Sequence, residues 1–135
     1  MKNLLLILIA AIAVSVTGCK ETDDAKNVLA NQKMQDTLNK LYPSLLQGHI
    51  NVEVHDFKNV SVLLGDKELY AKSDEELKTI SDNIANMIYD FYHENNYLDN
   101  GKVTFVAVED RMPTDADPKK EYDMHLQELV KAHEK

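Results

Sequence analysis

The five histidines have the most versatile side-chain chemistry in this 135-residue chain. His93 is followed by Glu94, but no second histidine completes the His-Glu-x-x-His pattern of a zinc protease. His125 and His133 are eight residues apart, which places them close to one face if they share a helix. Either ring could join nearby carboxylates around a metal ion. A small-ligand or metal-binding periplasmic module that uses His125 and His133 is therefore our alternative functional hypothesis.

Motifs for other kinds of chemistry are incomplete. Asp115 and Asp117 resemble the start of a calcium-binding loop, but Lys120 and Leu126 stand where that loop requires glycine and glutamate. The sequence contains no Gly-x-Ser-x-Gly elbow, phosphate-binding glycine loop or dinucleotide fingerprint. The leading hypothesis therefore includes no catalytic residue, no cofactor and no metal, and the protein is predicted not to be an enzyme.

Three tyrosines, Tyr89, Tyr92 and Tyr97, cluster near the end of the clearest amphipathic segment. Phe91 continues the apolar face of that segment, so Tyr89 and Tyr92 fall on either side of it. Exposed tyrosines beside an acidic surface are common in protein-recognition patches. Alternatively, such tyrosines cover the edge of a small core and form hydrogen bonds through their hydroxyl groups. Both interpretations remain open, and these three residues form the candidate interaction patch.

Cys19 is the single cysteine, and its position is distinctive. Lys2 opens the chain, Leu4 to Val16 form an almost unbroken apolar run, and Thr17-Gly18 precede the cysteine. A basic start, a short apolar stretch and small residues before a cleavage site are typical of a secretory signal. The apolar run is thirteen residues long, shorter than the roughly twenty that a membrane-spanning helix needs. An ordinary secretory signal would leave Cys19 as an unpaired thiol in an oxidising compartment.

The segment Val16-Thr17-Gly18-Cys19 resembles the lipobox of bacterial lipoproteins. In that class the chain is cut before the cysteine, the sulfur carries a diacylglyceryl group, and the new amino terminus is usually acylated. Two or more acyl chains hold a protein stably on a membrane, because each buried methylene contributes about 0.8 kcal/mol. The resemblance implies a signal peptide at 1–18, lipidation of Cys19, an acidic tether at 19–24 and a single domain at 25–135.

The residues after Cys19 bear on its location. Lys20 is not the aspartate that acts as an inner-membrane retention signal in enterobacterial lipoproteins. Followed by Glu21, Asp23 and Asp24, it resembles the surface-export signal of Bacteroidota lipoproteins. The body of the chain is also generally similar to small lipoproteins of that group. We expect a lipid anchor in the outer membrane, with the domain facing either the periplasm or the cell surface.

The chain is acidic, with a formal net charge of −8. The charge becomes about −9 when Lys2 leaves with a signal peptide. Such a domain should not bind nucleic acid or an anionic membrane surface through general electrostatics. Basic patches on other proteins are its natural counterparts. The leading hypothesis is therefore a lipid-anchored envelope lipoprotein with a non-catalytic interaction or accessory domain and an envelope protein as its partner.

Five of the six expected elements have clear local signals. A helix over 25–41, capped by Asp23 or Asp24, precedes two strands over 50–55 and 60–64 that form a hairpin. Ser73 and Glu76 make a capping box for a second helix, whose apolar residues recur at helical spacing as far as Phe91. A third strand is predicted over 102–108.

The last helix is predicted to start at Asp117-Pro118 and to place Tyr122, Leu126, Leu129 and Val130 inward. The element order is then αββαβα. We expect an α+β two-layer sandwich with a three-stranded sheet covered by helices on one face. The long helical connection favours parallel pairing of the third strand with one strand of the hairpin.

Overall fold

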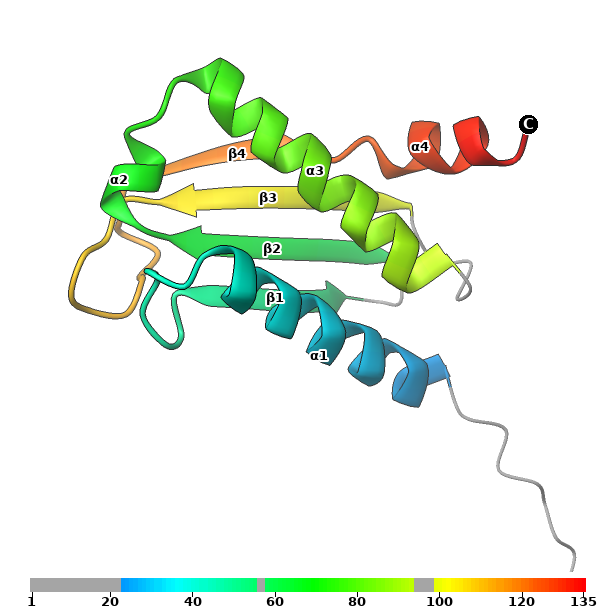
Figure 1. The fold of residues 1–135 in the computed structure, drawn as a ribbon, viewed down its shortest axis with the longest axis horizontal. Helices are drawn as coiled ribbons and strands as arrows, with labels where there is room; N and C mark the ends of the chain where they lie inside the picture. Colours follow the sequence, from blue (N-terminus) through cyan, green and yellow to red (C-terminus); the bar gives the residue numbers. More distant parts are fainter. Residues whose placement is uncertain (1–22, 56–57, 94–98) are drawn as a thin grey trace, which may run out of the picture.

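The computed structural model describes residues 23–55, 58–93 and 99–135 as an α+β fold in two layers, with helices over one face of a four-stranded mixed sheet (Figure 1). In chain order the elements are α1 (Asp23–Leu41), β1 (Ile50–His55), β2 (Asn59–Gly65), α2 (Lys67–Tyr70), α3 (Asp74–Tyr92), β3 (Asn100–Val106), β4 (Lys119–Asp123) and α4 (Leu126–His133).

The sheet has the strand order β1-β2-β3-β4. β1 and β2 form the predicted antiparallel hairpin, and β3 lies parallel to β2, as expected for strands joined by the long α3 crossover. One row of side chains on the helix-covered face crosses the whole sheet. It runs through Val52, Val62, Val103 and Tyr122, which the strand registers place side by side.

The fourth strand corrects the expected three-stranded sheet. β4 pairs antiparallel with β3 at residues where we expected the start of the last helix, and α4 begins only at Leu126. Asp117 cannot cap a helix, because Arg111 and Thr114 bind its carboxylate. The sequence of β4 is mostly charged and shows no apolar strand pattern. These residues form a strand because they pair with the free edge of β3, which overrides their local preference. Tyr122 still faces inward, but from a strand.

The first helix begins earlier than expected. α1 starts at Asp23, so Asp23 and Asp24 belong to the helix and do not cap it, and the final two residues of the expected tether are helical. The prediction for α3 is confirmed, since the Ser73 side chain accepts a hydrogen bond from the Glu76 amide and Glu76 bonds back to the Ser73 backbone. These reciprocal bonds satisfy two amides at the start of the helix.

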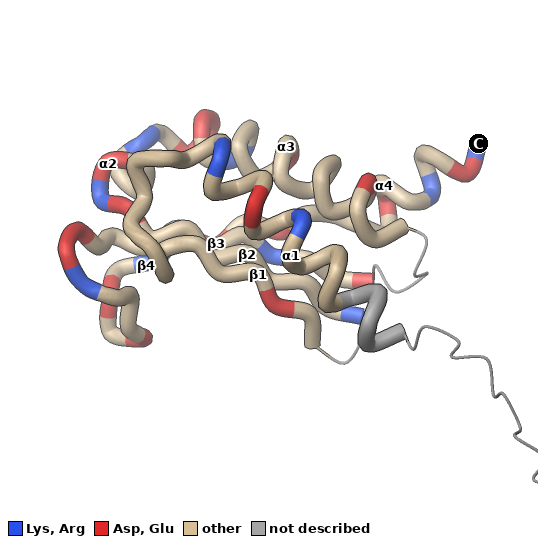
Figure 2. Tube along the Cα trace, turned by 60° about the horizontal axis from the view of Figure 1, so that its bottom comes forward, with Lys and Arg blue, Asp and Glu red and all other residues tan. Residues whose placement is uncertain are grey.

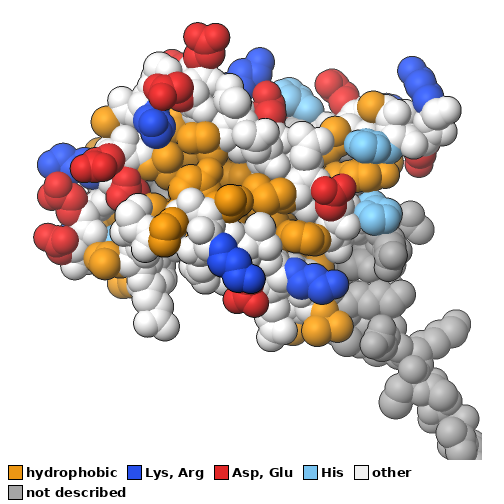
Figure 3. Space-filling view, viewed as in Figure 1, with side chains coloured by type: hydrophobic (Ala, Val, Ile, Leu, Met, Phe, Trp, Pro, Cys, Tyr) orange, Lys and Arg blue, Asp and Glu red, His pale blue; other side chains and the backbone are white. Residues whose placement is uncertain are grey.

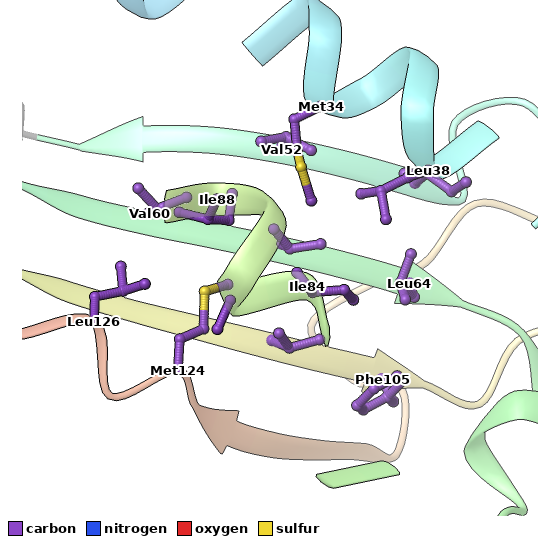
Figure 4. Close-up of a cluster of buried hydrophobic side chains, with 14 of the residues drawn as sticks. Met34, Leu38, Val52, Val60, Leu64, Ile84, Ile88, Phe105, Met124 and Leu126 are labelled. Atoms are coloured by element: carbon purple, nitrogen blue, oxygen red, sulfur yellow. The ribbon is translucent and has the colours of Figure 1, made fainter. Parts of the chain in front are cut away.

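The core lies between the helices and the sheet (Figure 4). Met34 and Leu38 of α1 pack over β1 and β2, while Ile84 and Ile88 of α3 pack over the centre of the sheet. Burying a side chain of this size stabilises the fold by about 1.5–3 kcal/mol. The central strands therefore supply most of the surface on which the helices rest.

The opposite face of the sheet carries mostly polar side chains, and among the described elements no helix covers it (Figure 2). Polar side chains there contact one another. Lys102 Nζ lies 3.2 Å from the Glu121 carboxylate, and His55 Nε2 lies 3.1 Å from that of Glu53. This face is a solvated surface.

The sheet has two ends with different neighbours (Figure 1). We call one of them the tether end: α1, β2 and β3 begin there. β1, β4 and α3 finish there, and the end of α3 lies beside α4. We call the opposite end the loop end: β2 and β3 finish there, beside the connections 42–49 and 107–118. A hydrogen bond from the Tyr92 hydroxyl to the Asn31 side chain joins the end of α3 to the first half of α1.

Candidate interaction surface

A stack of three rings lies where α3 and α4 meet. The ring of Tyr89 is stacked on that of His133, with centroids 4.2 Å apart and an angle of 16° between the planes. On its other side Tyr89 stacks with His93 at 5.2 Å and 21°. Figure 3 shows histidine and apolar surface together where these helices approach. The stack therefore places aromatic surface at the tether end.

The ring stack borders an open cleft of about 460 Å³. Its size lies within the range of small-ligand sites and is large enough for a bulky side chain of a partner. Acidic, basic, amide and apolar groups all contribute to the walls. Besides Tyr89 and His93, the lining residues are Asp99, Gln127, Val130, Lys131 and Glu134. An aromatic centre with a polar rim is typical of protein recognition sites.

Helix geometry positions each ring of the stack. His93 follows Tyr89 by four residues, which places the two rings on one side of α3. The Nδ1 atom of His93 donates a hydrogen bond to the Tyr89 carbonyl oxygen at 3.0 Å, since a carbonyl can only accept. On the other element, the buried Leu126 fixes the start of α4, and the half-buried Val130 packs against the core cluster. His133 extends from the last turn of α4 to reach Tyr89.

Two of the candidate tyrosines, Tyr89 and Tyr92, have different environments in the structure. Tyr89 is half-buried in the ring stack, whereas Tyr92 is only 2% exposed and donates a hydrogen bond to Asn31. Burial raises the pKa of Tyr92 well above its ordinary value. Tyr92 thus matches the alternative role of a core tyrosine and does not belong to a surface patch. Tyr97 lies outside the described residues.

His125 and His133 occupy opposite ends of α4. Eight residues of helix span about 12 Å, too far for both rings to bind one metal ion. His125 is exposed, precedes the first residue of α4 and has a left-handed backbone with φ of 49°. Across residues 23–55, 58–93 and 99–135, no group of three or more histidine, cysteine, aspartate or glutamate side chains is arranged to hold a metal. His133 instead contributes to the ring stack.

Cys19 lies outside the described residues, as does the apolar run before it. Of the helices that the structure describes, none is both long enough and apolar enough to cross a membrane. The expected lipidation of Cys19 therefore remains a prediction from the sequence motif.

Sequence reasoning identified Tyr89 and His133 separately but did not bring them together. The i, i+4 spacing of Tyr89 and His93 is a signal that could have identified their contact. The meeting of Tyr89 and His133 depends on how α4 packs against α3, and residues 44 positions apart in a single sequence give no local sign of it. No known protein family, curated protein or solved structure matches this chain.

Proposed function

We propose that this protein is an outer-membrane lipoprotein, acylated on Cys19, whose non-catalytic domain recognises an envelope protein through the cleft between α3 and α4. The sequence Val16-Thr17-Gly18-Cys19 supports the lipid anchor. The structure adds that an ordered helix begins at Asp23, so only three residues separate the cysteine from the fold. The domain is therefore attached to its anchor by a short connection.

The observation that carries the recognition role is the stack of His93, Tyr89 and His133. Rings held by stacking lose little side-chain entropy when a partner binds, because they are already ordered. Tyrosine is among the residues that contribute most to binding at protein interfaces, and the cleft surrounds it with polar groups of both charges. A partner that inserts one side chain beside Tyr89 would meet both an apolar wall and hydrogen-bonding groups.

Capture of partners from solubilised membranes tests the recognition role. Tyr89→Ala and His133→Ala remove rings of the stack, and each should lower the yield of the captured partner about tenfold, equivalent to about 1.4 kcal/mol. His125→Asn is the matched control, because His125 belongs to the same helix region but neither lines the cleft nor takes part in the ring stack, and asparagine tolerates its left-handed backbone. Equal capture by all three variants would contradict the proposed site.

A small molecule is the second candidate occupant, because the cleft volume falls within the usual range for ligand sites. Native mass spectrometry of protein purified from its own membranes distinguishes this case. A bound species that is present in the parent and His125→Asn proteins but missing from Tyr89→Ala would favour a ligand. Unliganded protein in every sample, together with partner capture that depends on Tyr89, would favour protein recognition.

The location is tested separately. Protease treatment of intact cells degrades a surface-facing domain and spares a periplasmic one, so either outcome fixes the orientation that the sequence leaves open. Density fractionation of the membranes tests outer-membrane anchoring. Recovery of the protein with the inner membrane would contradict that part of the proposal.

A further inference from the structure

We propose that the first two turns of α1 lie against the lipid headgroups, with Val28 and Leu29 as the contact residues. This inference rests on the proposed acylation of Cys19 and assigns a membrane-facing surface to the folded domain. Its consequence is that the start of α1 faces the bilayer and the loop end faces away.

Chain length limits how far the domain can stand from its anchor. Even when fully extended, the four residue steps from Cys19 to Asp23 span at most about 14 Å. From Asp23, α1 rises about 9 Å to reach Leu29. Leu29 therefore lies within about 25 Å of an acylated cysteine that is itself at the membrane surface. The loop end is separated from the start of α1 by the whole helix, about 28 Å.

The start of α1 presents apolar side chains that the fold does not use. Val28 is 55% exposed and Leu29 is 51% exposed, while Ala30 beside them is buried against the core. Leu29 points away from the helix face that carries Ala30 and Met34, because it is one residue away from the first of them. Two large apolar residues at the membrane-proximal end of an anchored domain fit a lipid surface better than water.

The neighbouring charges are compatible with this contact. Lys33 follows Leu29 by four residues and is exposed on the same side of α1, where its ammonium group can reach lipid phosphates. Asp36 follows Leu29 by seven residues, also on that side, and would be repelled by an anionic surface. Asp23 and Asp24 also stand in the first turn of α1, so charge alone does not select this part of the helix, and the exposed Val28 and Leu29 carry the preference.

Two apolar side chains would not bind a soluble protein to a membrane. Once an acyl anchor is in place, however, the contact becomes intramolecular and its effective concentration is high. The acidic charge of the chain opposes general adsorption to anionic lipid, so the contact should remain local. Acylation supplies the binding energy, and Val28 and Leu29 set the orientation.

Spin labels on introduced cysteines test this orientation in the full acylated protein, reconstituted into vesicles of phosphatidylethanolamine and phosphatidylglycerol. Labels are placed at Leu29→Cys, Val28→Cys, Asp36→Cys and Asp110→Cys, one in each variant. Position 36 is the matched control, two turns along the same side of the helix. Position 110 reports on the loop end. All four positions are exposed, so the substitutions should not disturb the core.

We expect the ratio of oxygen accessibility to water-soluble nickel accessibility to be several-fold higher at positions 28 and 29 than at positions 36 and 110. Equal ratios at all positions would overturn the inference. So would the highest ratio at position 110, which would mean the reverse orientation. Lower accessibility to both reagents at position 29, with broadening between labels, would indicate contact with a second copy of the chain and would also overturn it.

The parent protein separates this inference from the proposed function. Because Cys19 is the single cysteine, an acylated parent has no free thiol and takes up no label. A parent that is labelled at Cys19 would contradict the lipid anchor and, with it, the orientation. An unlabelled, vesicle-bound parent combined with equal ratios would contradict the orientation alone.

Discussion

The two ends of the sheet satisfy their polar groups in different ways. At the loop end, the carboxylate of Asp117 is buried and accepts hydrogen bonds from the Arg111 guanidinium, the Thr114 amide and the Thr114 hydroxyl. His49 is also buried there, with Nδ1 donating to the Gly65 carbonyl oxygen at 2.8 Å. These two buried side chains are engaged with the protein itself.

At the tether end the polar and aromatic groups face a cleft instead. Tyr89 stacks with both His93 and His133, and the side chains of Tyr89 and His93 also line an open cleft. Buried and fully bonded side chains fix a structure, whereas partly exposed rings with an adjacent cavity are free to bind. The loop end holds buried polar side chains in place, and the tether end carries the ring stack to which we assign the proposed recognition role.

Two glycines, one at each end, provide the largest expected effects. A Cβ at Gly101 would lie 2.6 Å from Leu126 Cδ1, so Gly101→Ala should push the start of α4 away from the sheet. We expect a loss of about 1–3 kcal/mol in the free energy of unfolding and weaker partner capture. A Cβ at Gly65 would lie 2.9 Å from Pro113 Cγ and from Val108 Cγ1, so Gly65→Ala should cost a similar amount at the loop end.

Urea unfolding and partner capture, measured on both variants, show which end of the sheet partner recognition depends on. The account predicts that capture falls beyond the loss of folded protein for Gly101→Ala only. Equal loss of capture for Gly65→Ala would mean that recognition depends on the loop end as well.

Acid should act mainly on the loop end. The Arg111 side chain and the Thr114 backbone amide hold the pKa of Asp117 well below its usual value. A carboxyl group with a lowered pKa in the folded state stabilises the protein above its ordinary pKa, near 4, and this stabilisation is lost as the pH falls further. Asp117→Asn should therefore be less stable than the parent at pH 7, and its stability should depend less steeply on pH below about 4.

Urea unfolding at neutral and acid pH measures this difference. If the parent and Asp117→Asn lose stability in parallel on acidification, Asp117 is not the group responsible.

A smaller effect should distinguish the two tyrosines of α3. Tyr92→Phe removes the hydroxyl that bonds to Asn31 and should cost about 1 kcal/mol, the usual net value of such a bond. Tyr89→Phe preserves the stacked ring and should change the unfolding free energy by less than about 0.5 kcal/mol. Thermal or urea unfolding of the pair gives the comparison, and an equal cost for both changes would contradict the separate roles of Tyr92 and Tyr89.

The smallest effects should come from exposed ion pairs. Lys67 Nζ lies 3.0 Å from the Glu109 carboxylate at the loop end, and Lys58 Nζ lies 3.9 Å from that of Asp99 at the tether end. All four side chains are substantially exposed, so Lys67→Ala and Lys58→Ala should each cost less than about 0.5 kcal/mol, and added salt should reduce the difference from the parent. Unfolding at low and high salt checks this. A cost well above that limit at either end would show that surface charge contributes more to stability than the account allows.

Local patterns predict those parts of the fold that depend on local interactions. The capping box at Ser73 and Glu76 identifies the start of α3, and the alternation of Ile50, Val52 and Val54 identifies β1. The parallel pairing of β2 and β3 also follows from a strand, helix, strand succession. In each case the sequence near the element is sufficient.

Features that depend on distant contacts were not predictable in this way. β4 alternates charged residues on the open face with Lys120 and Tyr122 on the covered face, so only its pairing with β3 makes it a strand. The burial of Tyr92 likewise depends on Asn31, 61 residues earlier. The ring stack joins Tyr89 to His133 through the packing of α4, which a single sequence does not reveal.

Both the proposed location of the protein and the proposed orientation of its domain depend on the lipid anchor at Cys19. Mass spectrometry of the amino-terminal peptide, prepared from protein purified from membranes, tests it directly. We expect a peptide that begins at Cys19 and carries a diacylglyceryl group on sulfur and an acyl group on the amino terminus. An unmodified thiol at Cys19 would contradict the account.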